Sequence, residues 1–486
     1  MTPDGGHAGR EAAGRGASPG RFEAPGRFEA SGRFEVPVEE LWAWHARPGA
    51  FERLAPPWDR VEVVRREGTI EDGLLEMKVP GPPGMRRWRA RMCDAEPGRR
   101  FVDVQEAGPF RAWRHEHHMA PDGPDASVLH DEIRYAMPFP PFGGWFGGPL
   151  VRRMLPRLFR FRHARTRDDL ERHARFRAAP RRRVAVSGAR GFLGSALVPF
   201  LTTGGHDVVP LVRGGGGGVA YDPKAGTFDA AALGDVDAVV HLAGAPVAAG
   251  RWTAARKAEI LASRVDGTAT VARAVAALPR RPEVLVVASA VGVYGDRGDE
   301  VLDEDAATGD GFLADVGRAW EAAAAPARDA GVRVVFARFG VVLGAAGGAL
   351  ARMRTPFAWG LGGPLGDGRA WVPWVALDDA VGAVHHAILD PTLMGPVNVV
   401  APAPVRWREL AATLGAVMRR PALLRMPRPL ARLAFGEMAD AVLLPSQRVA
   451  PARLAAAGFR WVRPDLADAL AHELGRAPAP VLRAGR

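Results

Sequence analysis

Two patterns of hydrophobic and polar positions divide the chain near residue 180. Before it, short segments of alternating apolar and polar residues are separated by turns such as Glu-Asp-Gly, Glu-Pro-Gly and Pro-Asp-Gly. After it, short continuous apolar runs alternate with longer segments of helical periodicity. The first pattern is typical of antiparallel strands with one buried face, and the second predicts a parallel sheet flanked by helices.

The first half is expected to form an antiparallel meander. A short strand at Arg33–Val36 precedes a Trp-rich helical segment at Val38–Leu54, and a long helix at Pro149–Arg175 follows the last strand. The strands between them are predicted at Val61–Arg65, Leu74–Val79, Arg86–Cys93, Arg100–Glu106, Ala112–Met119 and Val128–Ala136. This order resembles the START-like, polyketide-cyclase type of α+β helix-grip domain over residues 32–178. The resemblance implies an apolar cavity for a hydrophobic ligand.

Two sets of side chains in this domain are candidates for ligand binding. Aromatic residues either line such a cavity or simply pack in the core: Trp88, Phe101, Trp113, Tyr135 and Phe139. The run His115-Glu-His117-His118 places two histidines on one strand face and His118 on the other. Because no third ligand has a diagnostic spacing, we interpret this run as a solvated strand face and expect no metal site.

The long helix carries many arginines beside apolar residues. These cations are Arg152, Arg153, Arg157, Arg160, Arg162 and Arg165. A basic helix can lie on nucleic acid or on an anionic membrane. The interpretation we favour is a helix that buries its apolar stripe and covers the edge with arginine stems, with no nucleic-acid partner.

The second half predicts an α/β fold with a doubly wound parallel sheet, a Rossmann domain over residues 184–395. The strands are expected at Val184–Ser187, Asp207–Val212, Ala238–Leu242, Val284–Ala288 and Val332–Arg338. The intervening helices are expected at Gly194–Thr203, Arg256–Leu278 and Phe312–Ala330. A small helical domain is expected at 396–475.

The first of these strands runs directly into a glycine-rich turn. Gly188, Gly191 and Gly194 follow it at intervals of three, and Phe192 and Leu193 lead into the helix. A pyrophosphate-binding turn needs glycines for a sharp reversal, for close approach of the backbone to the ligand and for tight helix packing. The free N–H groups at the start of the helix then face the negative charge.

The end of the second strand indicates which dinucleotide binds. A carboxylate there would bind the ribose 2′-OH of NAD(H), but the strand ends at Leu211-Val212-Arg213. Arg213 and Arg190, which lies inside the glycine turn, are planar cations suited to a 2′-phosphate. The sequence therefore favours NADP(H) over NAD(H).

Several phrases together resemble the extended branch of the short-chain dehydrogenase/reductase superfamily. They are the glycine turn, His241-Leu242-Ala243-Gly244, Ala288-Ser-Ala-Val-Gly-Val-Tyr294-Gly and Arg338-Phe-Gly-Val-Val-Leu-Gly. Arg251-Trp252, Ser263-Arg-Val, Phe312-Leu-Ala-Asp-Val and Trp371-Val-Pro-Trp-Val narrow the likeness to its atypical, epimerase-like group, which carries a small C-terminal domain of unknown function. The resemblance implies cofactor contacts at Gly188, Gly191, Phe192, Leu193, Gly194, Arg213 and Ala243. Leu242, Gly244 and Ser289 are further candidates.

The chain departs from that superfamily at its catalytic pair. The superfamily uses a tyrosine with a lysine four residues on, which lowers the pKa of the phenol. This chain has three tyrosines and no lysine after Lys257, so the pair cannot form. Tyr294 and Ser289 are the remaining candidates for proton transfer, and a structural turn residue is the alternative for Tyr294.

A glycine-rich loop at Gly360–Gly368 follows the fifth predicted strand, where extended members bind substrate. Arg369 and Trp371 after it would suit a flat or anionic small molecule. Asp378-Asp379 is interpreted as a helix N-cap.

Composition sets outer limits on these hypotheses. The net charge of +11 comes almost entirely from arginine, and the single cysteine, Cys93, excludes an internal disulfide framework. No apolar run is long enough to span a bilayer, so a cytoplasmic protein is expected. Residues 1–31 are expected to be disordered, and residues 476–486 are expected to form a tail after the last domain. Two functions remain open: an NADP(H)-dependent, epimerase-like oxidoreductase, or a non-catalytic NADP(H) sensor coupled to a hydrophobic ligand.

Overall fold

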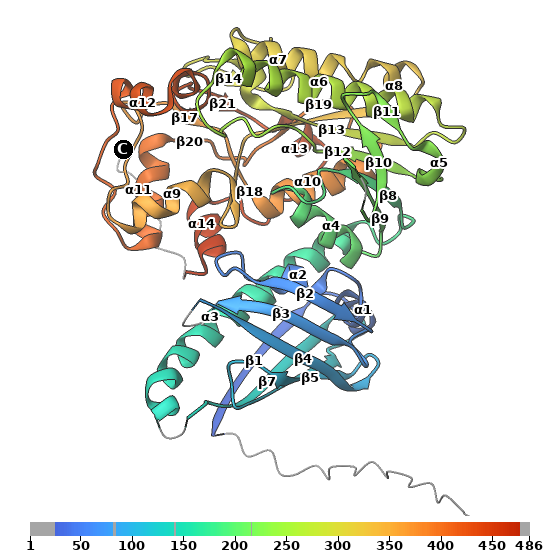
Figure 1. The fold of residues 1–486 in the computed structure, drawn as a ribbon, viewed down its shortest axis with the longest axis vertical. Coiled ribbons are helices and arrows are strands. Elements are labelled where there is room, and N and C mark those ends of the chain that lie inside the picture. The colour runs from blue at the N-terminus through green and yellow to red at the C-terminus, as the bar shows by residue number, and fades with distance from the viewer. Residues whose placement is uncertain (1–24, 81–83, 140–141, 215, 477–486) are drawn as a thin grey trace, which may run out of the picture.

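The computed structural model describes residues 25–80, 84–139, 142–214 and 216–476 of the chain. A smaller body rich in strands lies below a larger α/β body, and the long helix α3 (Phe142–Arg175) runs from the first to the second (Figure 1). Residues 1–24, for which disorder is predicted, and residues 477–486 of the expected tail lie outside the described residues.

The N-terminal body is a seven-stranded antiparallel sheet in the order β1-β7-β6-β5-β4-β3-β2. Two short helices, α1 (Val38–Ala46) and α2 (Ala50–Leu54), follow β1. The strands are β1 (Gly26–Phe34), β2 (Glu62–Glu67), β3 (Leu74–Pro80), β4 (Met85–Glu96), β5 (Arg100–Ala107), β6 (Ala112–Pro121) and β7 (Ser127–Ala136). Each strand after β1 pairs with the next along the chain, as the turn sequences predict.

The prediction of disorder up to residue 31 is wrong for residues 26–31. This segment forms most of β1 and pairs with β7 from Gly26 opposite Tyr135 to Phe34 opposite Ser127. Phe28 and Ala30 alternate with polar residues, and the Phe28 ring lies 5.2 Å from that of Phe159. The Gly/Ala/Arg-rich composition concealed a short alternating strand.

The larger body contains an eight-stranded sheet in the order β11-β10-β9-β8-β12-β13-β15-β19. All neighbours run parallel except β10 and β11. The strands are β8 (Arg183–Ser187), β9 (Asp207–Val212), β10 (Val219–Asp222), β11 (Thr227–Phe228), β12 (Ala238–His241), β13 (Val284–Ala290), β15 (Arg333–Phe339) and β19 (Gly395–Val399). The sheet thus continues past residue 395, where the sequence placed the end of the Rossmann domain.

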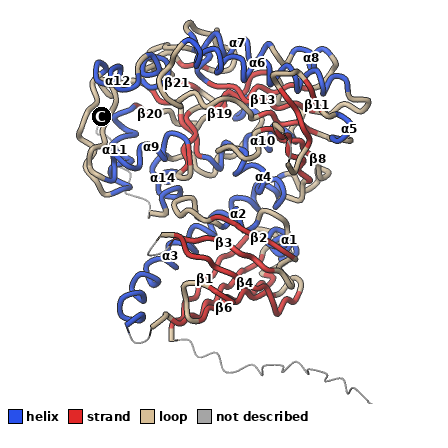
Figure 2. Tube along the Cα trace, in the orientation of Figure 1, coloured by secondary structure: helices blue, strands red, loops and turns tan. Residues whose placement is uncertain are grey.

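Helices cover both faces of this sheet, as Figure 2 shows. One face packs against α4 (Gly194–Thr203) and α10 (Leu377–Leu389), and the other against α6 (Ala254–Ala277), α7 (Phe312–Ala322) and α8 (Ala325–Asp329). The short α5 (Ala230–Leu233) lies before β12. Because both faces are buried, the central strands are continuous apolar runs, which is why the sequence reveals them.

The rest of the chain packs beside the carboxyl ends of the strands. Its core joins α9 (Gly348–Ala358), α11 (Trp407–Met418) and α14 (Leu466–Leu474). The smaller elements are η1 (Val291–Tyr294), β14 (Val301–Leu302), β16 (Val341–Gly344), β17 (Trp371–Val372), β18 (Trp374–Ala376), β20 (Val405–Arg406), α12 (Arg428–Phe435), η2 (Ala439–Leu443), β21 (Arg448–Val449) and α13 (Ala452–Ala456). Segments on both sides of residue 395 therefore build this region.

Buried ion pairs join α2 and α3 to the larger body. Asp378 of α10 accepts hydrogen bonds from Arg53 and Arg165, and all three side chains are at most 5% exposed. Arg172 pairs with Asp379 in the same way. The interpretation of Asp378-Asp379 as a helix N-cap is wrong: Ala376 is the N-cap residue, and the two carboxylates neutralise arginines of the neighbouring domain.

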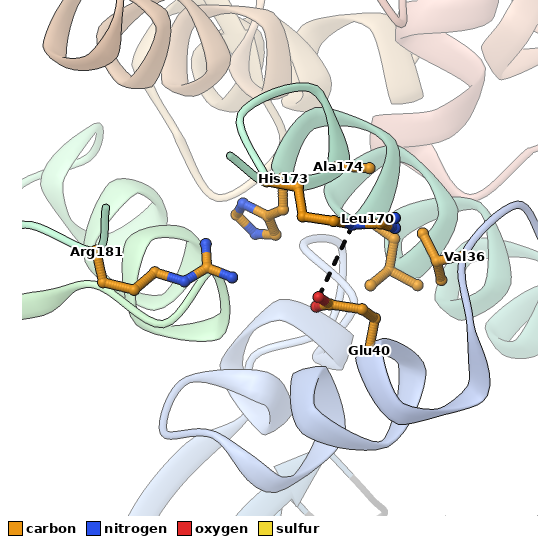
Figure 3. A pocket seen from close by; sticks show the side chains of 7 residues that line it. Val36, Glu40, Leu170, His173, Ala174 and Arg181 are labelled. Atoms are coloured by element: carbon orange, nitrogen blue, oxygen red, sulfur yellow. Dashed lines mark ion pairs between the residues drawn. The ribbon is translucent and has the colours of Figure 1, made fainter. Parts of the chain in front are cut away.

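A small pocket opens at the same junction, between α1, the end of α3 and the linker (Figure 3). Glu40 and Arg181 face it, and Glu40 lies 3.9 Å from Arg177. His173 also lines it, and burial keeps the pKa of this histidine well below its usual value. The junction thus holds neutral histidine next to paired charges.

Candidate functional site

The glycine turn lies at the carboxyl end of β8, where the strand order reverses. Gly188 has a φ of +70°, which favours glycine, and a Cβ there would lie 3.0 Å from the amide nitrogen of Ala243. A Cβ on Gly194 would overlap the carbonyl oxygen of Gly188 and lie 2.8 Å from the Cα of Ala189. The turn therefore brings strand, helix and the neighbouring β12 loop together without side chains between them, as a dinucleotide cleft requires.

Helix α4 presents its N-terminus to this turn. Gly191 donates its amide to the carbonyl of Gly188 at 2.8 Å, and the amide of Ser195 then bonds to Gly191. The N-cap residue, Leu193, supplies no side-chain cap, and the amides of Ser195 and Ala196 bond to backbone carbonyls of the turn. The amides just before them, at Leu193 and Gly194, are therefore the ones that can face an anion.

The backbone of Phe192 and Leu193 forms part of the glycine turn, whereas their side chains point to the core. The Phe192 ring lies so close to Gly344 and Gly347 that a Cβ on either glycine would fall 2.5–2.7 Å from it. Leu193 packs against the main cluster between the sheet and α4. Gly344 and Gly347 were not predicted as part of the site, and their spacing alone gave no signal for it.

The two arginines chosen for a 2′-phosphate lie at the same end of the sheet. Arg190 is exposed in the glycine turn, and its Nη2 lies 3.5 Å from the carbonyl oxygen of Gly216, in the loop that follows β9. Arg213 begins that loop and is also exposed. The structure thus brings the Arg190 side chain to the loop that Arg213 opens.

The loop after β12 forms the facing wall. Ser187 Oγ lies 3.2 Å from the amide of Leu242 and 2.7 Å from Nδ1 of His241. Complete burial lowers the pKa of His241 to about 4, so this ring is neutral. Ala243 is half-buried and Gly244 exposed, which leaves backbone at the mouth of the cleft.

Ser289 and Tyr294 belong to one buried polar chain across the strand ends. Ser289, Arg338 and Asn398 are direct cross-strand neighbours on β13, β15 and β19. Ser289 donates to Glu321 at 2.7 Å, and Arg338 binds both oxygens of that carboxylate at 2.8 Å. Arg338 also donates to the Tyr294 hydroxyl at 2.9 Å, which in turn donates to Asn398 at 2.8 Å.

These hydrogen bonds matter for the hypothesis that Tyr294 and Ser289 transfer protons in catalysis. Tyr294 is completely buried, and burial raises the pKa of its phenol despite the nearby Arg338. A proton-transfer tyrosine needs the opposite shift. A part for Tyr294 or Ser289 in catalysis stays a prediction, and the geometry favours a structural part for both.

Trp371, which the sequence predicts to contact substrate, lies in a cluster of charged side chains. Its indole Nε1 donates to Asp299 at 2.6 Å. The guanidiniums of Arg406 and Arg448 lie 4.2 and 5.0 Å from the ring centroid. Arg369 joins the group through its carbonyl, which accepts from Arg406 at 2.5 Å. Asp299, Arg406 and Arg448 were missed because they come from segments that are distant in the sequence.

The predicted solvated face at His115 and His117 is wrong. Both rings point into the N-terminal domain and are 3% and 7% exposed, whereas the His118 side chain is 40% exposed on the other face. Asp103 on β5 and Asp131 on β7 lie against the two buried rings. These carboxylates on neighbouring strands compensate the burial, and nothing local in the sequence links them to the histidines.

The five aromatic residues proposed for an apolar cavity do not form one group. Trp88 packs against Trp113 with centroids 5.1 Å apart, and Trp113 lies 6.4 Å from Tyr135. Phe101 stacks on His117 in a different cluster, and Phe139 is 83% exposed. Core packing, in two separate clusters, therefore accounts for four of the five.

Comparisons with known proteins agree with this organisation. The NAD dependent epimerase/dehydratase family model matches residues 184–400, a polyketide cyclase/dehydrase and lipid transport model matches 34–161, and a domain of unknown function, DUF1731, matches 426–473. An epimerase family protein of Mycobacterium bovis is 43% identical over 296 residues, which cover 60% of this chain and 98% of that protein. Human SDR39U1, also described as an epimerase family protein, is 36% identical over 59% of this chain and 98% of its own.

Two solved structures extend the likeness. A crystal structure described as a nucleoside-diphosphate sugar epimerase from Corynebacterium glutamicum has a TM-score of 0.75 at 33% identity and covers 92% of this chain and 90% of that one. Human SDR39U1 isoform 2, solved with NADPH, has a TM-score of 0.57 at 35% identity and covers 60% of this chain and 99% of its own.

Among the described residues, no helix combines the length and the apolar character needed to cross a bilayer. The family matches fall on the same segments as the two bodies of the fold. The chain therefore belongs to the NAD dependent epimerase/dehydratase family, with a polyketide-cyclase-type domain before the epimerase domain and a DUF1731 domain after it.

Proposed function

We propose that the chain is an NADP(H)-binding, epimerase-like oxidoreductase of the atypical short-chain dehydrogenase/reductase group. The observation that carries this proposal is the glycine turn at the end of β8, with Arg190 reaching the loop that Arg213 opens. Two guanidiniums at this position suit a 2′-phosphate, and the expected carboxylate for a free 2′-OH is missing. The human relative solved with NADPH supports the same cofactor.

The cofactor would be held mainly by backbone atoms of the cleft. The first amides of α4 would face the pyrophosphate, and Ala243 and Gly244 would allow the adenosine half to pass close to β12. A bound nicotinamide supplies hydride transfer. Proton movement needs a group other than a Tyr-x-x-x-Lys pair, because the chain has no such pair.

The substrate side offers cations and an aromatic ring. Trp371 with Arg406 and Arg448 suits a small flat or anionic molecule, which would displace part of the ion pair between Arg406 and Asp299. Because Asp299 is 72% exposed, the side chains here are accessible to such a molecule. We therefore place substrate contact at Trp371 and its neighbouring arginines.

A second function is favoured by a specific observation. Tyr294 is enclosed in the Arg338–Asn398 contacts, while α3 connects a polyketide-cyclase-type domain to α10 through buried ion pairs. A hydrophobic ligand in the first domain would then be coupled to cofactor occupancy without turnover. This is the non-catalytic NADP(H) sensor.

Turnover separates the two functions. The purified full chain is incubated with NADPH and a panel of carbonyl compounds and nucleotide sugars, and NADPH absorbance and product formation are followed. Turnover that survives in Tyr294→Phe supports an oxidoreductase whose proton donor lies elsewhere. Tight NADPH binding with no oxidation or epimerisation of any substrate supports the sensor, and absence of NADPH binding contradicts both.

A further inference from the structure

Five ionisable side chains are buried together inside the N-terminal domain. Asp103 lies opposite His115, and His117 lies opposite Asp131, on the adjacent strands β5, β6 and β7. Alternation places all four on the inner face of the sheet, and His163 of α3 reaches them from the covering helix. Of the four buried, inward-facing positions of β6, Trp113 and Met119 are apolar, whereas the two between them carry imidazoles where a core strand normally carries apolar residues.

We propose that Asp103, His115 and His117 bind a divalent transition-metal ion of the Zn²⁺ class. Asp103 Oδ2 lies 3.0 Å from His115 Nδ1 and 3.4 Å from His117 Nε2, and one ligand atom from each residue lies within 4.8 Å of the others. Metal–ligand bonds of about 2.0–2.1 Å in a tetrahedron separate ligand atoms by roughly 3.3 Å. The two distances from Asp103 Oδ2 therefore match edges of a coordination polyhedron, and the three residues have ligand atoms close enough to share one ion.

Asp131 occupies the position of an orienting carboxylate. Its Oδ1 makes a hydrogen bond with His115 Nε2 at 3.0 Å and lies 2.9 Å from His117 Nδ1 without hydrogen-bond geometry; both nitrogens face away from Asp103. Its other oxygen lies 2.7 Å from His163 Nε2. Metal-binding histidines usually direct their second nitrogen to such a carboxylate, which fixes the ring and the tautomer.

Charge balance supports an ion in this position. The Asp131 side chain is 2% exposed and that of Asp103 17%, so two carboxylates need about two positive charges nearby. Protonated imidazoles at His115, His117 or His163 could supply them, but the rings of His115 and His117 lie 3.7 Å apart and tilted by 44°, so protonation of both would place two cations in contact. A divalent ion balances both carboxylates while the rings stay neutral.

The ring of His117 gives a second indication. It is 7% exposed, and its Nδ1 makes no hydrogen bond of acceptable geometry within the described residues, despite its short distance to Asp131. Its Nε2, in contrast, points to Asp103. The ring is therefore oriented by its Asp103 side, where the ion is proposed.

The surroundings make this a closed, structural site. Phe101 stacks on His117 with centroids 4.0 Å apart, and the edge of Phe159 meets His115 at 5.4 Å. Through Asp131, the site also reaches His163 on α3. Binding of the ion would fix three strands and the covering helix in one arrangement, independently of the dinucleotide cleft in the other body.

The test is the metal content and the zinc response of the full chain, purified without a polyhistidine tag. Elemental analysis should find about one transition-metal ion per chain. After treatment with chelator, Zn²⁺ titrated by calorimetry should bind with a stoichiometry of one and raise the melting temperature. Less than about 0.1 ion per chain, together with a melting temperature that Zn²⁺ leaves unchanged, overturns the proposal.

Matched variants locate the ion. His117→Gln and Asp103→Asn should each weaken Zn²⁺ binding at least tenfold, whereas His118→Gln, one position along the same strand with its ring facing away, should bind like the wild type. Equal losses in His117→Gln and His118→Gln would show an adventitious surface ion and reject the site. X-ray absorption of the wild type needs no variant to fold: two histidine nitrogens at about 2.0–2.1 Å support the site, and a shell without histidine contradicts it.

Discussion

Removing the carboxylate of Asp378 should destabilise the junction between the two bodies. The side chain is 4% exposed and accepts hydrogen bonds from Arg53 and Arg165, which are 3% and 5% exposed. In Asp378→Ala, Arg53 keeps Asp169, at 2.5–2.7 Å, but Arg165 keeps no carboxylate closer than Glu473 at 3.9 Å, beside the imidazole of His472 at 3.4 Å. A buried charge that loses its partner costs about 3–5 kcal/mol.

The assay is differential scanning calorimetry of the full chain. At roughly 2–4 °C per kcal/mol for a body of this size, the transition should fall by about 6–20 °C. The control is Asp440→Ala, which also removes an arginine partner, but from a pair whose side chains are 57% and 41% exposed. Such exposed pairs contribute about 0–1 kcal/mol, so its transition should move by no more than about 4 °C. Equal shifts in the two variants would refute the reasoning that burial makes the Asp378 contacts stabilising.

Three further predictions concern the cofactor turn, the buried tyrosine and acid stability. Gly194→Ala should weaken NADPH binding at least ~tenfold, or about 1.4 kcal/mol, because the added Cβ overlaps the carbonyl oxygen of Gly188. In the control variant Gly292→Ala, the added Cβ meets nothing closer than 3.4 Å, so NADPH affinity should be retained. Equal NADPH affinities of the two variants in a fluorescence titration would contradict this reasoning. Tyr294→Phe should cost about 1–3 kcal/mol in urea unfolding through its lost hydrogen bonds, with NADPH affinity unchanged; unaltered stability would show that the hydroxyl is not structural. Burial, with Arg181, Arg182 and Arg47 nearby, lowers the pKa of His206 from 6.5 to about 4. Between these two pH values, His206 is protonated in the unfolded chain and neutral in the folded chain. Its contribution should be complete above pH 6.5 and fall by up to about 3 kcal/mol towards pH 4, and His206→Gln should flatten that slope in melts at pH 7.5 and 5.0.

The sequence is most informative where the physical signal is local. Helix α4 begins and ends at the predicted residues, Gly194 and Thr203, because a buried strand, a glycine turn and a helical pattern follow one another directly. The same holds for β9, predicted and found at Asp207–Val212. Position of the cofactor arginines also follows from local order, since each comes immediately after a recognisable strand or turn.

Residues whose environment comes from distant segments were misjudged. His115 and His117 lie on an alternating strand, and only Asp103 and Asp131 on neighbouring strands explain why they are buried. Asp378 has the local appearance of a helix cap, although its partners come from α2 and α3, more than 200 residues away. Such pairs depend on tertiary contact, which no periodicity in one segment encodes.

Calorimetric titration of the full chain with NADPH and with NADH tests the central claim most directly. Charged hydrogen bonds of about 1.5–3 kcal/mol to a 2′-phosphate predict that NADPH binds the wild type at least ~tenfold more tightly than NADH. The double variant Arg190→Ala/Arg213→Ala should lose that preference while it keeps its affinity for NADH. Equal affinities of the wild type for the two dinucleotides, or no heat with NADPH, would contradict the account.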